Sequence, residues 1–209
     1  MHKVDYYNEM FKAGKGEGWD NAPGKIIILN AFKDISAQLS KDTIILDVGC
    51  GTGYMLNMIQ NTIQSNAIKL IGIDISEVAI NIAKKRYPDI EFHLGDATHT
   101  FFEDKSIDVV ISYGTYEHFD VPEDGIKEMA RILKPWSVFL LMIPALGHYR
   151  KDRTDEGWYE DKTGQPQWNL FRETWELFFR KYKLKLSSVD KSIKHGAKNP
   201  GVFFFGNKM

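Results

Sequence analysis

Short apolar runs recur along the first two thirds of the chain, and most are followed by a polar stretch with helical spacing. The runs lie at residues 43–48, 69–74, 90–94, 107–112 and 137–143, and the helical stretches at 54–64, 76–86 and 122–133. Continuous apolar runs of this length are typical of strands buried on both faces. Their alternation with helices predicts right-handed crossovers and an α/β fold whose parallel sheet is covered on both faces.

The segments around this core extend the pattern. Residues 25–39 have apolar side chains at helical spacing and predict a helix, although the run Ile26–Ile28 alone would suggest a strand. In 76–86, Ser76 is expected to cap the helix, and Val78 and Ile82 are expected to face the sheet. Residues 172–182 predict a helix, and 184–190 and 202–205 predict two strands that pair as a hairpin at one sheet edge.

Length and spacing predict one domain with four parts. The 209 residues contain no obvious linker. The parts are an N-terminal cap or lid with the first helix (1–40), a ligand-binding core (41–144), a substrate-side insertion (145–170) and a C-terminal helix and hairpin (171–209). Residues 145–170 have no clean period, so they predict an extended loop or a small insertion.

Composition narrows the classes of partner. The formal net charge is -1, so no global basic field would attract nucleic acid. No run approaches the roughly 20 apolar residues that a membrane span needs, and the first residues lack a signal-peptide stretch. We therefore expect a cytoplasmic protein with no nucleic-acid or membrane partner. Because Cys50 is the single cysteine, an internal disulfide and a multi-cysteine zinc site are excluded, and we expect no metal.

The strongest chemical signal is the sequence LDVGCGTG at 46–53, where the first strand ends and a helix begins. Gly49, Gly51 and Gly53 allow positive φ and close approach of a ligand to the backbone. The helix offers free N–H groups, and Asp47 lies at the carboxyl end of the strand, where open α/β sheets bind ligands. Taken alone, the loop could also be a simple chain reversal.

Two further carboxylates follow the next two strands. Asp74 in IGIDIS could accept hydrogen bonds from both hydroxyls of a ribose, or cap a helix. Asp96 in LGDA could meet an adenine amino group, or form a turn after Gly95. A dinucleotide fold would instead require G-x-G-x-x-G, whereas here the third glycine comes one residue early and Tyr54 occupies the expected position.

These motifs, together with DVVISYGTYEHF and LKPWSVFLLMIP, resemble the class I S-adenosylmethionine-dependent methyltransferases, most closely the branch that methylates small molecules. The resemblance covers about residues 41–144. It implies a doubly wound, mostly parallel seven-stranded sheet of order 3-2-1-4-5-7-6, with the last strand antiparallel and helices on both faces. It also implies S-adenosylmethionine as the cofactor and S-adenosylhomocysteine as the product.

The resemblance implies roles for individual residues. Asp47, Gly49, Cys50, Gly51 and Gly53 would hold the methionine part of the cofactor, Asp74 with Ile75 the ribose, Asp96 with Ala97 the adenine, and Ser112 and Tyr113 would lie under the cofactor. Methyl transfer is an in-line displacement, so the enzyme mainly aligns the acceptor and excludes water. A general base is needed only when the acceptor must lose a proton.

The acceptor side is expected from residues after the fourth strand. His118 is a candidate base or substrate contact, or it positions the loop. Glu117 could pair with a cation or cap the next helix. Tyr113, a third catalytic candidate, could line the pocket or fill it, as could Tyr116.

Two other segments could close over the site. His148, Tyr149, Arg150 and Trp158 are candidate acceptor-binding residues, unless the tryptophans of this segment only anchor a surface loop. Residues 6–19 could form a lid in which Trp19 covers the cofactor, or a loose terminus with an aromatic anchor.

Two functions stay open at this stage. One is an active methyltransferase for a small-molecule acceptor, as a monomer or homodimer. The other is a cofactor-binding partner subunit of the same fold that no longer transfers methyl groups. A protein or nucleic-acid methyltransferase is disfavoured, because the charge is near neutral and Ser112–Thr115 replaces an Asn-Pro-Pro-Tyr-type signature.

Overall fold

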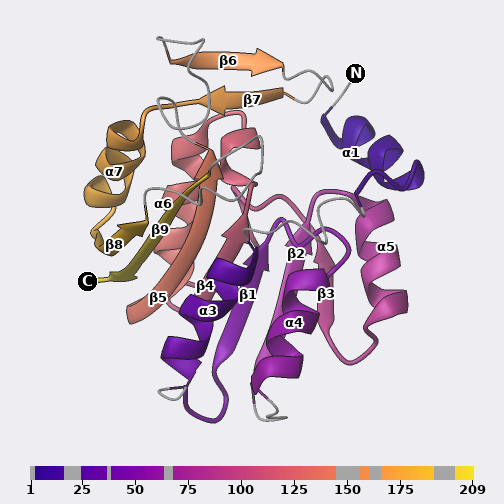
Figure 1. Cartoon of the computed structure of the whole chain (residues 1–209), viewed down its shortest axis with the longest axis horizontal. Helices are drawn as coiled ribbons and strands as arrows, with labels where there is room; N and C mark the ends of the chain where they lie inside the picture. The colour runs from indigo at the N-terminus through magenta and orange to yellow at the C-terminus, as the bar shows by residue number, and fades with distance from the viewer. Residues whose placement is uncertain are drawn as a thin grey trace.

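The structure is a computed structural model that describes residues 3–16, 25–36, 39–63, 68–144, 156–160, 166–190 and 201–209. Figure 1 shows a central sheet flanked by helices, with a small hairpin beyond the carboxyl ends of its strands. The helices are α1 (Lys3–Lys12), α3 (Lys25–Ser36), α4 (Tyr54–Ile63), α5 (Glu77–Arg86), the 3-10 helix η1 (Tyr116–His118), α6 (Pro122–Ile132) and α7 (Arg172–Lys181). The strands are β1 (Ile44–Val48), β2 (Lys69–Asp74), β3 (Glu91–Leu94), β4 (Ile107–Tyr113), β5 (Leu133–Pro144), β6 (Gly157–Glu160), β7 (Pro166–Asn169), β8 (Leu184–Asp190) and β9 (Gly201–Lys208).

The main sheet has seven strands in the order β3-β2-β1-β4-β5-β9-β8. Strands β1 to β5 pair in parallel, and β9 is antiparallel to both β5 and β8. In the register, Leu46 of β1 lies between Ile71 of β2 and Val110 of β4. All three side chains are buried, as the continuous apolar runs predict. The predicted order and the antiparallel last strand are confirmed.

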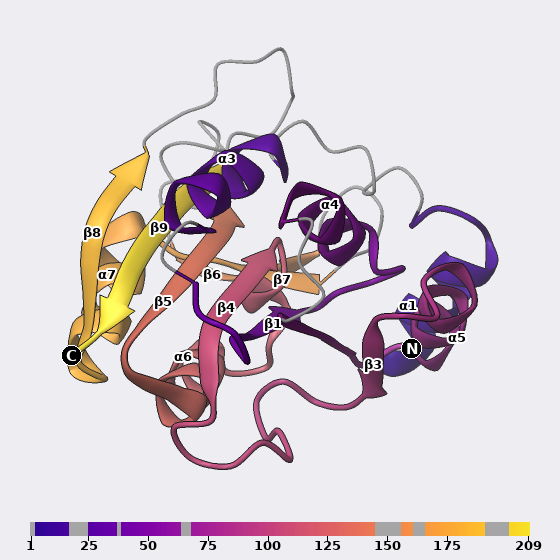
Figure 2. The ribbon, with the colours of Figure 1, turned by 90° about the horizontal axis from the view of Figure 1, so that it is seen from below.

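Helices cover both faces of the sheet (Figure 2), and each face buries an apolar cluster. On one face, Phe32 of α3 and Leu56 of α4 are fully buried with the sheet residue Ile45. On the other face, Met129 of α6 and Trp175 of α7 pack with a second set of sheet side chains. Parallel strands alternate their side chains between the two faces, so both layers are needed to bury them.

The inward face of α5 differs from the prediction. Ile80 and Ala83 pack toward the sheet, whereas Val78 and Ile82 are only partly buried. Val78 lies beside the apolar side chains of α1. The prediction assumed that α5 meets one neighbour, but it meets two, so its apolar positions are divided between the sheet and α1.

Two segments have more regular structure than their sequence suggested. Residues 3–12 form α1, in which Tyr7, Met10 and Phe11 are buried at i, i+3, i+4 spacing. Within 145–170, β6 and β7 pair as an antiparallel hairpin, with Trp158 opposite Trp168. The described part of this segment is therefore a hairpin, not an irregular loop. Residues 25–36 are helical, which decides that alternative in favour of the helix.

Strand β5 begins four residues earlier than predicted, immediately after α6 ends at Ile132. Trp136 lies within it at φ 65° and is three-quarters exposed. None of the described helices is long and apolar enough to cross a membrane.

Candidate active site

The loop after β1 has a left-handed backbone that its glycines permit. Gly49, Gly51 and Gly53 have φ of 72°, 52° and 82°, where side chains are disfavoured. A Cβ on Gly49 would lie 2.1 Å from Oγ1 of Thr115. The backbone N–H groups of Gly49 and Cys50 both donate to the carbonyl of Ile73, at 2.9 and 3.1 Å. The loop is therefore fixed between the end of β2 and the turn after β4.

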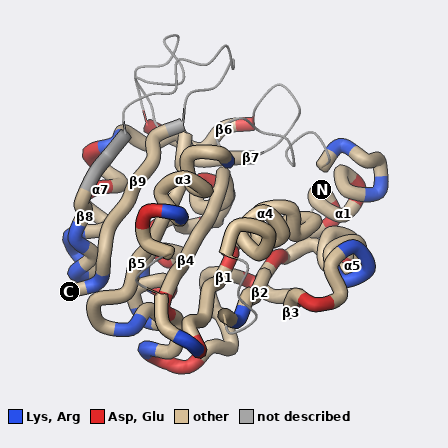
Figure 3. Tube along the Cα trace, turned by 60° about the horizontal axis from the view of Figure 1, so that its bottom comes forward, with Lys and Arg blue, Asp and Glu red and all other residues tan. Residues whose placement is uncertain are grey.

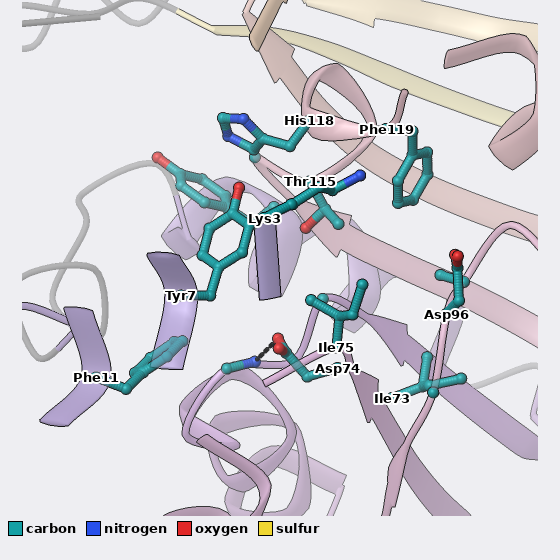
Figure 4. A pocket seen from close by; sticks show the side chains of 16 residues that line it. Lys3, Tyr7, Phe11, Ile73, Asp74, Ile75, Asp96, Thr115, His118 and Phe119 are labelled. Carbon is teal, nitrogen blue, oxygen red and sulfur yellow. Dashed lines mark hydrogen bonds between the residues drawn. The ribbon is translucent and has the colours of Figure 1, made fainter. Parts of the chain in front are cut away.

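Asp74 ties this loop to the start of α5. Its Oδ2 accepts from the N–H of Gly51 and its Oδ1 from the N–H of Ser76, both at 2.9 Å (Figure 4, dashed line for Gly51). Burial raises the pKa of Asp74, and these backbone donors offset part of the rise. A carboxylate has about four acceptor positions, so these backbone donors leave room for a hydroxyl hydrogen bond from a ligand.

Asp96 follows β3 and stabilises its own turn. Its Oδ1 accepts from both the N–H and the hydroxyl of Thr98 at 2.8 Å. The side chain is exposed. Both of its sequence-based interpretations are therefore compatible with the geometry, because the turn leaves the second carboxylate oxygen available.

A pocket opens at the carboxyl ends of β1, β2, β3 and β4, with α1 on its open side (Figure 4). It is lined by Lys3, Tyr7, Phe11, Gly49, Gly51, Ile73, Asp74, Ile75, Gly95, Asp96, Ala97, Tyr113, Gly114, Thr115, His118 and Phe119. One end combines backbone N–H groups with two carboxylates. The other end brings together a lysine, a histidine, a threonine and two aromatic rings. We refer to them as the carboxylate end and the histidine end.

The histidine end is built by α1 and η1. The rings of Tyr7 and His118 lie edge to face with centroids 6.2 Å apart. His118 also lies next to Glu117, with Nε2 3.5 Å from Oε1. Phe119 follows directly and its ring lies 5.9 Å below the ammonium of Lys3.

Glu117 is a carboxyl group that is buried beside the histidine end of the pocket. Only 2% of it is exposed, and its Oε2 has no hydrogen-bond partner among the described residues. Burial raises its pKa to about 8. Burial therefore favours the protonated form of this carboxyl group beside the imidazole of His118.

Several predicted residues line the pocket and others support it. Gly49, Gly51, Asp74, Ile75, Asp96, Ala97, Tyr113 and His118 line it. The others do not line it and are buried: Asp47, Cys50, Gly53, Ser112 and Glu117.

Two of the supporting residues have clear structural partners. The Ser112 hydroxyl donates to the carbonyl of Val48 at 2.7 Å, which fixes the end of β1 against β4. Burial raises the pKa of Asp47 to about 7, while the charge of Lys25 lowers it. Tyr116 fills the core beside Phe119 rather than lining the pocket.

The predicted acceptor segment is only partly described. Trp158 is 41% exposed on β6, packs edge to face on Trp168, and does not line the pocket. Trp168 donates from Nε1 to the carbonyl of Asp120 at 3.1 Å, so it anchors the hairpin beside η1. Trp19, His148, Tyr149 and Arg150 lie outside the described residues.

Sequence reasoning missed much of the histidine end. Lys3, Phe11, Thr115 and Phe119 line the pocket but were not candidates. The spacing of Tyr7, Met10 and Phe11 would have indicated a helix with a buried face. No local signal connects that helix with η1, which lies more than a hundred residues further along the chain.

Comparison with known proteins places the chain in a family. Residues 46–141 match the model of a family described as a methyltransferase domain. The chain is 30% identical over 142 residues to a demethylmenaquinone methyltransferase of Chlorobaculum parvum, covering 68% of this chain and 55% of that protein. The chain spans about half the length of the curated relatives it matches.

Solved structures share the fold. A chain from the Haloferax volcanii complex with the Trm112 methyltransferase activator superposes with a TM-score of 0.71, 18% identity and 96% coverage of both chains. A SAM-dependent methyltransferase from Methanosarcina mazei superposes with a TM-score of 0.69 and 19% identity, covering 84% of this chain and 96% of that one. The matched domain, the glycine loop and the strand order are those of the class I S-adenosylmethionine-dependent methyltransferases.

Proposed function

We propose that the protein transfers a methyl group from S-adenosylmethionine to a small-molecule acceptor. The observation that carries the proposal is the joining of the carboxylate end and the histidine end in one pocket. When bound, S-adenosylmethionine supplies a methyl group activated by its positive sulfonium. What remains for the protein is to hold donor and acceptor in line and to exclude water.

The carboxylate end suits the nucleoside part of this cofactor. Asp74 would accept from a ribose hydroxyl through the acceptor position that its backbone donors leave open. Asp96 and Ala97 would contact the adenine, and the loop from Gly49 to Gly53 would hold the methionine part. Asp47, Cys50 and Ser112 would act from behind, by fixing the backbone of that loop.

The histidine end would take the acceptor. His118 would accept a proton from an acceptor that must lose one. A proton on His118 favours the ionised form of Glu117, because opposite charges 3.5 Å apart attract. Glu117 would therefore act as a positioning residue and counter-charge, while Tyr7 and Tyr113 would form apolar walls.

Charge and relatedness support a small acceptor over nucleic acid. Basic and acidic positions are interleaved along the described chain, and the C-terminal edge around α7, β8 and β9, where many basic positions gather, is at the opposite end of the sheet from α1 (Figure 3). The name of the Chlorobaculum parvum relative gives a small molecule as its substrate.

The test is a calorimetric titration with S-adenosylmethionine and S-adenosylhomocysteine. We expect saturable binding by the parent protein and at least tenfold weaker binding by Asp74→Ala, which corresponds to a loss of about 1.4 kcal/mol. Asp89→Ala, an exposed carboxylate before β3, is the matched control and should bind normally. Thermal melts establish that both variants fold.

Each outcome has a separate meaning. A folded parent protein that binds neither ligand refutes the proposal. Binding without turnover, across an acceptor panel with a labelled methyl donor, indicates the partner-subunit function instead.

A further inference from the structure

We propose that Lys3 binds a carboxylate group of the methyl acceptor, which makes this a methyltransferase for acidic acceptors. The inference rests on the proposed function and specifies its substrate class. Figure 4 shows the Lys3 side chain crossing the pocket from α1, with its ammonium between Thr115 and Phe119. Among the described residues that line the pocket, Lys3 is the one lysine or arginine.

The environment of Lys3 is that of a binding group rather than of a surface lysine. Only 20% of its side chain is exposed. Its ion pair with Asp120 is long, at 3.4 Å, and the Asp120 side chain is 84% exposed. Exposed pairs of this kind contribute little, whereas holding an ammonium group away from water is costly. An anion in the pocket would compensate Lys3 better than Asp120 does, and Asp120 could return to water.

The location of the charge differs from that of the buried carboxylate. Figure 4 shows the ammonium of Lys3 between Thr115 and Phe119, apart from the Asp74 carboxylate at the glycine loop. An acidic acceptor would therefore be repelled from the carboxylate end and attracted to the histidine end. The field of the pocket would orient the acceptor before any contact with its reacting atom.

The chemistry of the site selects a group with one negative charge on a ring or chain of modest size. Lys3 supplies one positive point charge, without the fork of donors that an arginine offers to phosphate. Phe119 and Tyr7 beside it provide apolar and aromatic walls. A carboxylate attached to a ring matches both features.

The competing explanation is that Lys3 is only a latch. In that case the Lys3–Asp120 pair holds α1 against η1, and the two residues should be equivalent. In our proposal they are not, because Lys3 attracts the acceptor while Asp120 competes with it. If the pair is only a latch, Lys3→Met and Asp120→Asn should have the same effect. If Lys3 binds the acceptor, only Lys3→Met should weaken acceptor binding.

The experiment compares benzoate with benzamide, two ligands of the same shape that differ in charge. Both are titrated into the protein with and without S-adenosylhomocysteine, at constant ionic strength, with binding followed by ligand-observed NMR. We expect the parent protein to prefer benzoate by about tenfold, as one charged hydrogen bond provides. Lys3→Met should lose the preference, Lys3→Arg should retain part of it, and Asp120→Asn should retain or increase it.

The proposal is overturned by four results. These are equal binding of the two ligands to the parent protein, binding of neither, a preference that survives in Lys3→Met, or a preference that disappears in Asp120→Asn. The calorimetric titration with S-adenosylhomocysteine tests the proposed function separately. If it fails while benzoate still binds through Lys3, the anion site exists without the methyltransferase assignment.

Discussion

Trp136 has a backbone conformation that is unfavourable for a residue with a side chain. It has φ 65°, in the left-handed region, where a Cβ costs about 1–2 kcal/mol relative to glycine. Trp136 is 75% exposed, so burial of its side chain contributes little free energy to offset that strain. The position therefore suits glycine better than tryptophan.

Replacing Trp136 by glycine should stabilise the protein. The release of backbone strain outweighs the greater freedom of glycine in the unfolded chain, for a net gain of up to about 1 kcal/mol. For a chain of this size, that raises the melting temperature by about 2–4 °C. Trp136→Ala removes the indole but keeps the Cβ, so it should show no gain. A glycine variant no more stable than the alanine variant would contradict this account.

The predictability of the site also differs between residues. The carboxylate end was predictable because each of its groups follows a strand directly, and parallel strands bring their carboxyl ends to one edge. The burial of Glu117 and the position of Asp47 behind the pocket lining were not predictable, because burial depends on packing that short motifs do not encode. Lys3 had no signal of its own, since a lysine near a chain end is most often a solvated residue.

Among the elements, the strands and the sheet order followed from the sequence, and the helix faces followed less well. The apolar runs identify buried strands whatever covers them, whereas their order was implied by the resemblance, with which β3-β2-β1-β4-β5-β9-β8 agrees. The face of α5 depended on α1, which the sequence left as a lid or a loose terminus. Without that neighbour, the partial burial of Val78 has no explanation.

The contact between α1 and α5 is specific as well as apolar. Asn8 of α1 accepts from the hydroxyl of Ser76 at 2.8 Å and from the N–H of Val78 at 3.3 Å. Ser76 itself caps α5 by accepting from the N–H of Ala79. Two of the free N–H groups in the first turn of α5 are thus satisfied, one of them by α1.

Asn8→Ala should therefore loosen α1 without unfolding the sheet. The loss leaves buried donors without a partner and costs about 1–3 kcal/mol of local stability. Amide hydrogen exchange should accelerate about tenfold or more in α1 and remain unchanged in β1 and β4. Asn61→Ala, at an exposed hydrogen bond within α4, is the control. Equal acceleration in both variants, or none in α1, would refute the role of Asn8.

For the whole molecule, buried carboxyl groups with raised pKa values make stability depend on pH, and Asp47 and Glu117 are two of them. Burial raises the pKa of Asp47 to about 7 and that of Glu117 to about 8. In the unfolded chain both groups ionise near pH 4, so the folded state binds protons more tightly over the interval between. These groups contribute most to the free energy of unfolding below about pH 4, and their contribution is lost as the pH rises toward 8.

Glu117→Gln isolates one part of this dependence. The amide has the shape of the protonated carboxyl group and does not ionise, so the variant should gain stability over the parent as the pH rises. Between about pH 5 and pH 8 the difference should grow by roughly 2–4 kcal/mol, as a shift of this size implies. Urea unfolding at several pH values measures it, and the remaining dependence contains the part from Asp47. If both proteins lose stability with the same slope, Glu117 is ionised in the folded state, and the counter-charge proposed for His118 is then present before any proton arrives.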